Sequence, residues 1–233
     1  MLGLLVIIVV SWVLLHFIEK KNIAVLGIIP NCKRSIQFLI GFIIIILISL
    51  FTIYLESIVL KVDWELKSNI NYKDIFNSFV YHLRSALTED LVFRGAILYI
   101  LIQRIGVQKA MILSAISFGI YHVFSYGMTE AKIIPILYVV LITGFTGYVW
   151  AYTFHRTKSI LMALGFHLGH NLLMTLFYES APYGELVFTE ISKTDLRDWN
   201  WLFYNLIKGL FPSIAILVFV KQYIKYNQKE KAS

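Results

Sequence analysis

The stretch Ile36–Leu60, which reads IQFLIGFIIIILISLFTIYLESIVL, decides the class of this protein. It carries one charged side chain, Glu56, and exceeds the about 20 residues that a helix needs to cross a bilayer. The whole chain has the same character, since 58% of its 233 residues are hydrophobic and only 15% are charged. A soluble domain carries about 25% charged residues. The sequence therefore predicts a polytopic membrane protein.

Apolar blocks of similar length recur along the chain and predict an all-α, polytopic transmembrane helical bundle of about seven spans. Each span must be helical, because an open strand cannot satisfy its backbone hydrogen bonds in lipid. The longest polar stretch, 179–198, is too short to fold alone, so we expect residues 1–233 to form a single integral membrane domain. The expected spans are Leu2–Ile18, Ile36–Leu60, Ile75–Ile102, Ala110–Ser125, Ile133–Phe154, Ile160–Phe177 and Trp199–Ile224.

The net charge of +7 lies mainly at the ends of these segments, which indicates topology signals and no nucleic-acid partner. Basic residues concentrate in the loops around 20–34, 104–109 and 156–158 and in the tail 221–231, whereas the alternate loops hold fewer. The positive-inside rule then predicts an outside N-terminus and a cytoplasmic C-terminus. Cys32 is the only cysteine, so the chain can form neither an intrachain disulfide nor a thiolate metal site.

Ionisable residues interrupt the third apolar segment, where each costs ~2.5 to 3.5 kcal/mol at bilayer depth. Asp90 and Arg94 are four residues apart, share one helix face and can pair. Glu89 lies about 100° round the helix from Asp90, so Arg94 can neutralise Asp90 and leave Glu89 directed elsewhere. A carboxylate in a low-dielectric cavity is a stronger base. We expect Asp90 and Arg94 to brace the helices and Glu89 to act as a base in the reaction.

Two further polar clusters lie in apolar segments. Phe118 and His122 share one helix face, and so do His167 and Asn171, with His170 beside them. Each could be a hydrogen-bonding brace between helices. Together with Glu89 they could also activate water and stabilise an oxyanion, or offer two imidazoles and a carboxylate to a metal. Neither an HExxH nor a GxSxG motif is present.

The order acidic-acidic-x-x-x-Arg, Phe-x-x-x-His and His-x-x-x-Asn on three apolar helices resembles the CPBP family. This family comprises the type 2 CAAX prenyl endopeptidases and their bacterial relatives, including bacteriocin-processing and bacteriocin-immunity members. The resemblance covers about 75–177, which is the CPBP-like core of the expected domain. Asp90 departs from the family pattern, which has Glu at that position, but Asp90 still reaches Arg94.

The resemblance implies a role for each motif residue. Glu89 would be the general base acting on water, and His122 would help to activate that water. His167 and Asn171 would stabilise the oxyanion or complete a metal site. Asp90, Arg94 and Phe118 would be supporting residues, and His170 lies outside the motifs.

The resemblance also implies an intramembrane peptide hydrolase of the glutamic or metallo-endopeptidase type. The resemblance implies either no cofactor or one divalent metal ion, for which zinc is the first candidate. Glu89, His122 and His167 would hold that ion. The expected substrate is a peptide or a membrane-associated protein, prenylated or not. The protein itself is expected to be a multi-pass protein of a bacterial cell membrane.

Two alternatives stay open on the sequence. The first is a non-enzymatic bacteriocin-immunity or partner-binding protein on the same fold, which the Asp90 departure favours slightly. The second is a proton or ion transporter that uses Glu89, His122 and His167 as a relay. Neither an inverted repeat nor a matching pair of broken helices supports the transporter.

Overall fold

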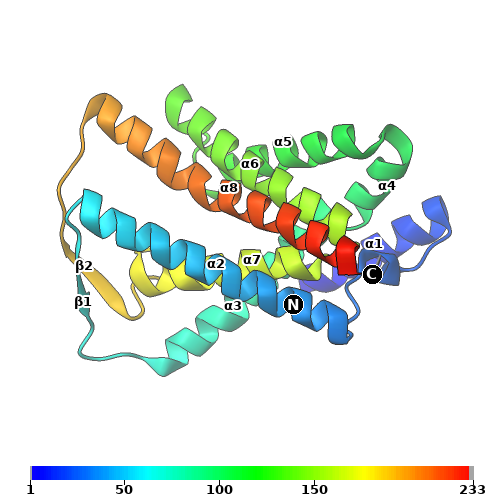
Figure 1. Ribbon diagram of the computed structural model, residues 1–233, viewed down its shortest axis with the longest axis horizontal. Helices are drawn as coiled ribbons and strands as arrows, with labels where there is room; N and C mark the ends of the chain where they lie inside the picture. Colours follow the sequence, from blue (N-terminus) through cyan, green and yellow to red (C-terminus); the bar gives the residue numbers. More distant parts are fainter. Residues whose placement is uncertain (1, 231–233) are drawn as a thin grey trace.

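The structure, a computed structural model, describes residues 2–230, and it confirms an all-α helical bundle (Figure 1). Lys231, which belongs to the basic tail, lies outside the described residues. A short 3₁₀ helix, η1 (Ile23–Leu26), occupies an apolar stretch that is too short to cross a membrane. The α-helices are α1 (Leu2–Glu19), α2 (Cys32–Val59), α3 (Tyr72–Arg94), α4 (Ala96–Ile105), α5 (Val107–Ser125), α6 (Ile133–Thr157), α7 (Leu161–Phe177) and α8 (Asp198–Glu230).

Five of these helices are long and apolar enough to cross a membrane, namely α1, α2, α5, α6 and α8. Helix α7 is apolar but shorter, with 17 residues. The five long helices expose many large apolar side chains, which is how a helix facing lipid differs from one in a soluble core. The chain is therefore an integral membrane protein.

The expected single span over 75–102 is wrong, because the chain breaks there into α3 and α4. Gly95 lies at the break, and a Cβ atom at this position would collide with the backbone of Leu91. The helix ladder is interrupted, and the Ser114 hydroxyl donates to the freed carbonyl oxygen of Phe93 at 2.7 Å. The break ends α3 directly after Arg94, so the acidic motif lies in the last two turns of α3.

A two-stranded antiparallel sheet joins parts of the chain that the sequence analysis treated as loops. Strand β1 (Asp63–Leu66) precedes α3, and β2 (Phe188–Ser192) follows α7. The two strands lie at one end of the bundle, outside the long apolar helices (Figure 1). They bring the chain on either side of α3–α7 together.

Helix α2 packs along α7, and this contact fixes the helix that carries the third motif. Gly165 and Gly169 face α2, and a Cβ atom at Gly169 would lie 2.6 Å from Ile45 Cγ2. Small residues let two membrane helices approach closely. The side chains of Phe166 and His167 are consequently buried, with 0% and 4% exposed.

The loops that the sequence grouped by charge also group in space. The start of α2, the junction of α4 and α5, the end of α6 and the end of α8 lie at one end of the bundle (Figure 1). The β1–β2 sheet lies at the other end. The bundle thus separates the more basic loops from the more acidic ones.

Candidate active site

Glu89 projects from the last turns of α3 toward two imidazole rings. Its Oε2 lies 3.7 Å from His167 Nε2 and 4.0 Å from His122 Nε2. Its Oε1 accepts a hydrogen bond from the Ser85 hydroxyl, one turn earlier, at 3.2 Å. Oε2 is buried and has no hydrogen-bond partner among the described residues. One carboxylate oxygen is therefore anchored, and the other is free to accept a proton.

His122 projects from α5, and its ring is fixed by its own helix. Its Nδ1 lies 2.8 Å from the Phe118 carbonyl oxygen, which can only accept a hydrogen bond, so Nδ1 carries a proton. In the neutral ring, Nε2 is then an acceptor that faces Glu89. The ring also packs edge-on against Phe118, with centroids 4.3 Å apart.

His167 projects from α7 and lies between the two adjacent carboxylates of α3. Its Nδ1 is 3.5 Å from Asp90 Oδ1, while its Nε2 faces Glu89. The indole of Trp150, on α6, lies against the imidazole with centroids 4.5 Å apart. These three contacts hold the His167 ring from two neighbouring helices, α3 and α6.

Asp90 and Arg94 pair as the helical spacing predicts. Arg94 Nη1 donates to Asp90 Oδ1 at 3.1 Å, and both side chains are fully buried. The guanidinium carbon lies 3.9 Å from the Phe118 ring centroid and 4.8 Å from that of Trp150. Such contacts stabilise a desolvated cation. Phe118 thereby links the first motif to the second.

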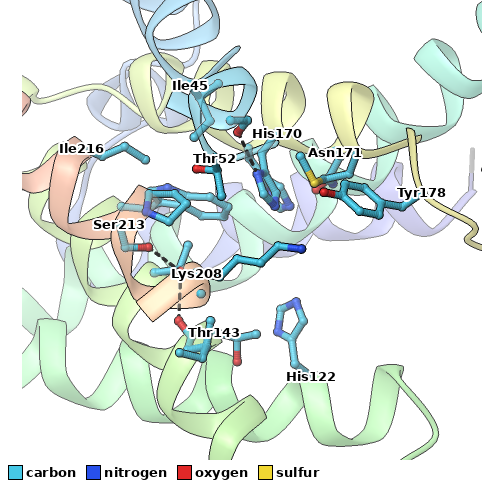
Figure 2. Close-up of a pocket in the computed structure, with 18 of the residues that line it drawn as sticks. Ile45, Thr52, His122, Thr143, His170, Asn171, Tyr178, Lys208, Ser213 and Ile216 are labelled. Carbon is cyan, nitrogen blue, oxygen red and sulfur yellow. Dashed lines mark hydrogen bonds between the residues drawn. The ribbon is translucent and has the colours of Figure 1, made fainter. Parts of the chain in front are cut away.

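Helix α7 brings the remaining motif residues to a cavity of about 390 Å³. Asn171 and His170 line this cavity together with His122 and His167. Figure 2 shows His170 and Asn171 projecting from α7, with His122 on the opposite wall and Lys208 extending between them. Glu89 does not line the cavity itself; it contacts the two imidazoles that do. His170 Nδ1 lies 3.4 Å from the Ser49 hydroxyl, so its partner is α2.

Asn171 stands apart from the other three predicted catalytic residues. Its side chain makes no hydrogen bond to Glu89, His122 or His167 in the part of the chain that the structure describes. It is half-buried and lines the open space of the cavity. The structure therefore brings Glu89 within 4.0 Å of both His122 and His167 and places Asn171 on the wall of the adjoining cavity.

The donor types of Glu89, His122 and His167 suit a zinc ion, which prefers imidazole nitrogen and carboxylate oxygen. Their arrangement does not match, because within residues 2–230 no three His, Cys, Asp or Glu side chains are grouped so as to hold a metal ion.

Several residues of the site carry no signal in the sequence. Ser85 lies one turn before Glu89, which is the only pattern that could have indicated it. Trp150 and Tyr126 join the site from elements outside the motifs, and Tyr126 packs against His122 with ring centroids 5.1 Å apart. Burial, together with the charge of Glu89, raises the pKa of Tyr126 to about 12, so its hydroxyl remains a donor at neutral pH.

A second polar group closes another part of the cavity wall. Lys208, on α8, donates to Glu56 Oε1 of α2 at 2.5 Å, and the Tyr178 hydroxyl donates to Glu56 Oε2. Burial and the hydrogen bond to Glu56 raise the pKa of Tyr178 well above its usual range, which keeps the phenol a donor. This triad joins α2, α8 and the end of α7.

A family model described as "Type II CAAX prenyl endopeptidase Rce1-like" matches residues 71–173. No curated protein and no solved structure gives a significant match. The matched segment contains all three motifs, from Glu89 to Asn171, on the helices that meet at this site. This segment, which is less than half of the 233-residue chain, is similar to the Rce1-like family of type II CAAX prenyl endopeptidases.

Proposed function

We propose that this protein is an intramembrane endopeptidase in which Glu89 activates the attacking water. The observation that carries the proposal is the free, buried Oε2 of Glu89, which lies between the Nε2 atoms of two histidines. The distances of 3.7 and 4.0 Å exceed those of direct hydrogen bonds. A water molecule between these groups would satisfy all three.

The hydrolytic step needs one base and one proton carrier. Glu89 Oε2 accepts a proton from water as the water oxygen bonds to the peptide carbonyl carbon, and His122 Nε2 accepts the second hydrogen bond of that water. The tetrahedral intermediate then collapses, the C–N bond breaks, and the Glu89 proton passes to the leaving nitrogen. Water is consumed, and one acid and one amine are produced.

In this proposal, side chains of α7 stabilise the oxyanion. The Asn171 amide is a donor on the cavity wall, and His167 lies beside Glu89. Donors aimed at a developing oxyanion are worth about 10²- to 10³-fold in rate. Asp90 positions His167 through the contact of Oδ1 with Nδ1 of the ring. The same carboxylate oxygen pairs with Arg94.

The cavity walls suit a substrate that has apolar side chains and a polar peptide backbone. Its walls combine aliphatic side chains with hydroxyl groups, including Ile45, Ile142, Met174, Thr143 and Thr146. We propose a peptide or a segment of a membrane-associated protein, prenylated or not, as the substrate. The aliphatic walls suit a lipid group or an apolar side chain, and the hydroxyls suit peptide amides.

Replacement of Glu89 by Gln tests the proposal most directly. Glu89→Gln and His122→Ala should each lower the cleavage rate of a fluorogenic peptide library by about 10²- to 10⁴-fold, because each removes a proton acceptor. The measurement is the cleavage rate of the purified protein in lipid nanodiscs. The exposed pair Glu65→Gln and His16→Ala are matched controls that should keep the wild-type rate.

Two other outcomes would replace the proposal. If both Glu89→Gln and His122→Ala cleave at the wild-type rate, Glu89 is not the base. A chain that binds a partner equally well with and without Glu89→Gln, and cleaves nothing, is the non-enzymatic binding protein. Chelation followed by metal analysis decides separately whether activity requires a divalent metal; the proposed step requires none.

A further inference from the structure

A second cavity lies far from the candidate active site, at the more basic end of the bundle. It has a volume of about 680 Å³ and lies where α2 begins, α6 ends and α8 approaches its end. Figure 1 shows these three helix ends beside one another. We call it the basic groove, lined by Cys32, Lys33, Ile36, Gln37, Arg156, Thr157, Tyr223, Ile224, Asn227 and Gln228.

Two cations of the basic groove have no counter-ion among the described side chains. Lys33 and Arg156 are both exposed, and neither forms an ion pair with a carboxylate among the side chains that the structure describes. Lys33 lies in the first turn of α2, whose free amide groups and positive dipole end also favour an anion. The basic groove is therefore electrostatically suited to a negatively charged ligand.

Gln37 supplies an independent sign of a missing ligand. Its side chain lines the basic groove, is only 3% exposed, and its Oε1 has no hydrogen-bond partner among the described residues. A buried acceptor without a donor costs about 1 to 3 kcal/mol. The ligand that suits this position offers a hydroxyl or amine hydrogen as well as a negative charge.

The position of the basic groove indicates where such a ligand comes from. It lies at the ends of three apolar helices, which is the depth of lipid headgroups. Ile36 is 49% exposed and, with Ile224, continues the groove as an apolar surface. Basic pockets between membrane helices on the cytoplasmic side recognise anionic headgroups.

We propose that the basic groove binds an anionic phospholipid whose headgroup carries hydroxyl donors, of the phosphatidylglycerol type. The phosphate lies between Lys33 and Arg156, a headgroup hydroxyl donates to Gln37 Oε1, and an acyl chain follows Ile36. The bound lipid joins α2, α6 and α8, the helices that also line the candidate active-site cavity. The proposal does not depend on the proposed hydrolysis, since it concerns a separate site.

Native mass spectrometry of the full-length protein, titrated with phosphatidylglycerol in detergent, tests the proposal. The double variant Lys33→Gln/Arg156→Gln should bind phosphatidylglycerol about thirtyfold more weakly, because each basic residue contributes about fivefold near an anionic lipid. The double variant Lys21→Gln/Lys109→Gln removes two exposed cations outside the basic groove, one after α1 and one in the first turn of α5, and should bind like wild type. Gln37→Leu should weaken binding by about fivefold through the lost hydrogen bond.

Three results would overturn the proposal. Equal affinity for phosphatidylcholine would show that charge is not recognised. An equal loss in both double variants would show a diffuse surface attraction in place of a site. Displacement of phosphatidylglycerol by inorganic phosphate alone would assign the basic groove to a free anion instead of a lipid.

Discussion

At the scale of single residues, two neighbouring carboxylates have different surroundings. Asp90 is fully buried against Arg94, whereas Glu89 faces His122 and His167. The pairing of Asp90 with Arg94 was predictable, because residues four apart share a helix face. The contact between Asp90 and His167 was not, because it depends on how α7 packs against α3.

Paired substitutions at Asp90 and Arg94 should separate bracing from chemistry. Arg94→Met alone should lower the free energy of unfolding by about 3 to 5 kcal/mol, because it leaves Asp90 buried without a counter-ion. The double variant Asp90→Leu/Arg94→Met should be distinctly more stable than Arg94→Met, because no lone charge remains. Denaturant titration in detergent micelles gives both values.

The partly exposed pair of Arg104 and Glu19 is the matched control, with its atoms 3.1 Å apart. Its double replacement by Met and Leu should change stability by about 1 kcal/mol or less. A double variant Asp90→Leu/Arg94→Met that is no more stable than Arg94→Met alone would contradict the bracing role. The variant Asp90→Leu/Arg94→Met should cleave more slowly than wild type even where it is stable, because His167 loses its contact with Asp90.

At the scale of helices and strands, the long apolar runs predicted most of the bundle. Apolar length fixes a span, because lipid tolerates only satisfied backbone. It did not predict the break at Gly95, which depends on the Ser114 hydroxyl from another helix. The β1–β2 sheet was missed for a similar reason, since its strands are short and lie far apart in the sequence.

The close contact of α2 and α7 should be sensitive to added volume. In Gly169→Val the new Cβ would lie 2.6 Å from Ile45 Cγ2 and 3.0 Å from the Phe42 carbonyl oxygen, so the Ile45 side chain or α7 must shift. We expect a loss of about 1 to 3 kcal/mol in unfolding free energy and a lower cleavage rate, because α7 carries His167 and Asn171. Thermal unfolding and peptide cleavage measure the two effects.

Gly3→Val is the matched control, since a Cβ atom there would have no neighbour within 4 Å. It should unfold and cleave like wild type. A Gly169→Val variant with wild-type stability would show that α2 and α7 are not closely packed at this position.

At the scale of the whole molecule, the structure places the basic loops at one end, where the positive-inside rule expects the cytoplasm. Cys32 reports on this end directly, because it is exposed and is the only cysteine in the chain. In intact cells Cys32 should resist a membrane-impermeant maleimide and should react after permeabilisation. Mass spectrometry of the labelled protein gives the modified fraction.

The variant Cys32→Ser/Ser68→Cys moves the thiol to an exposed position beside β1, at the other end of the bundle. It should react in intact cells. The reverse pattern for the two thiols would invert the topology while leaving the site geometry as described.

The β1–β2 sheet has a consequence for how this protein could diversify. The pairing of the two strands closes the chain between 66 and 188 into a loop. This loop contains residues 71–173, which match the family model, and all three motifs. Helices α2 and α8 lie outside the loop but supply other walls of the same cavity, among them Ser49 and Lys208. The cavity walls thus come from both inside and outside the loop, whereas Glu89, His122, His167 and Asn171 all lie inside it. Under the proposed function, an exchange of α2 and α8 between relatives would change part of the substrate cavity and leave the proposed catalytic residues in place.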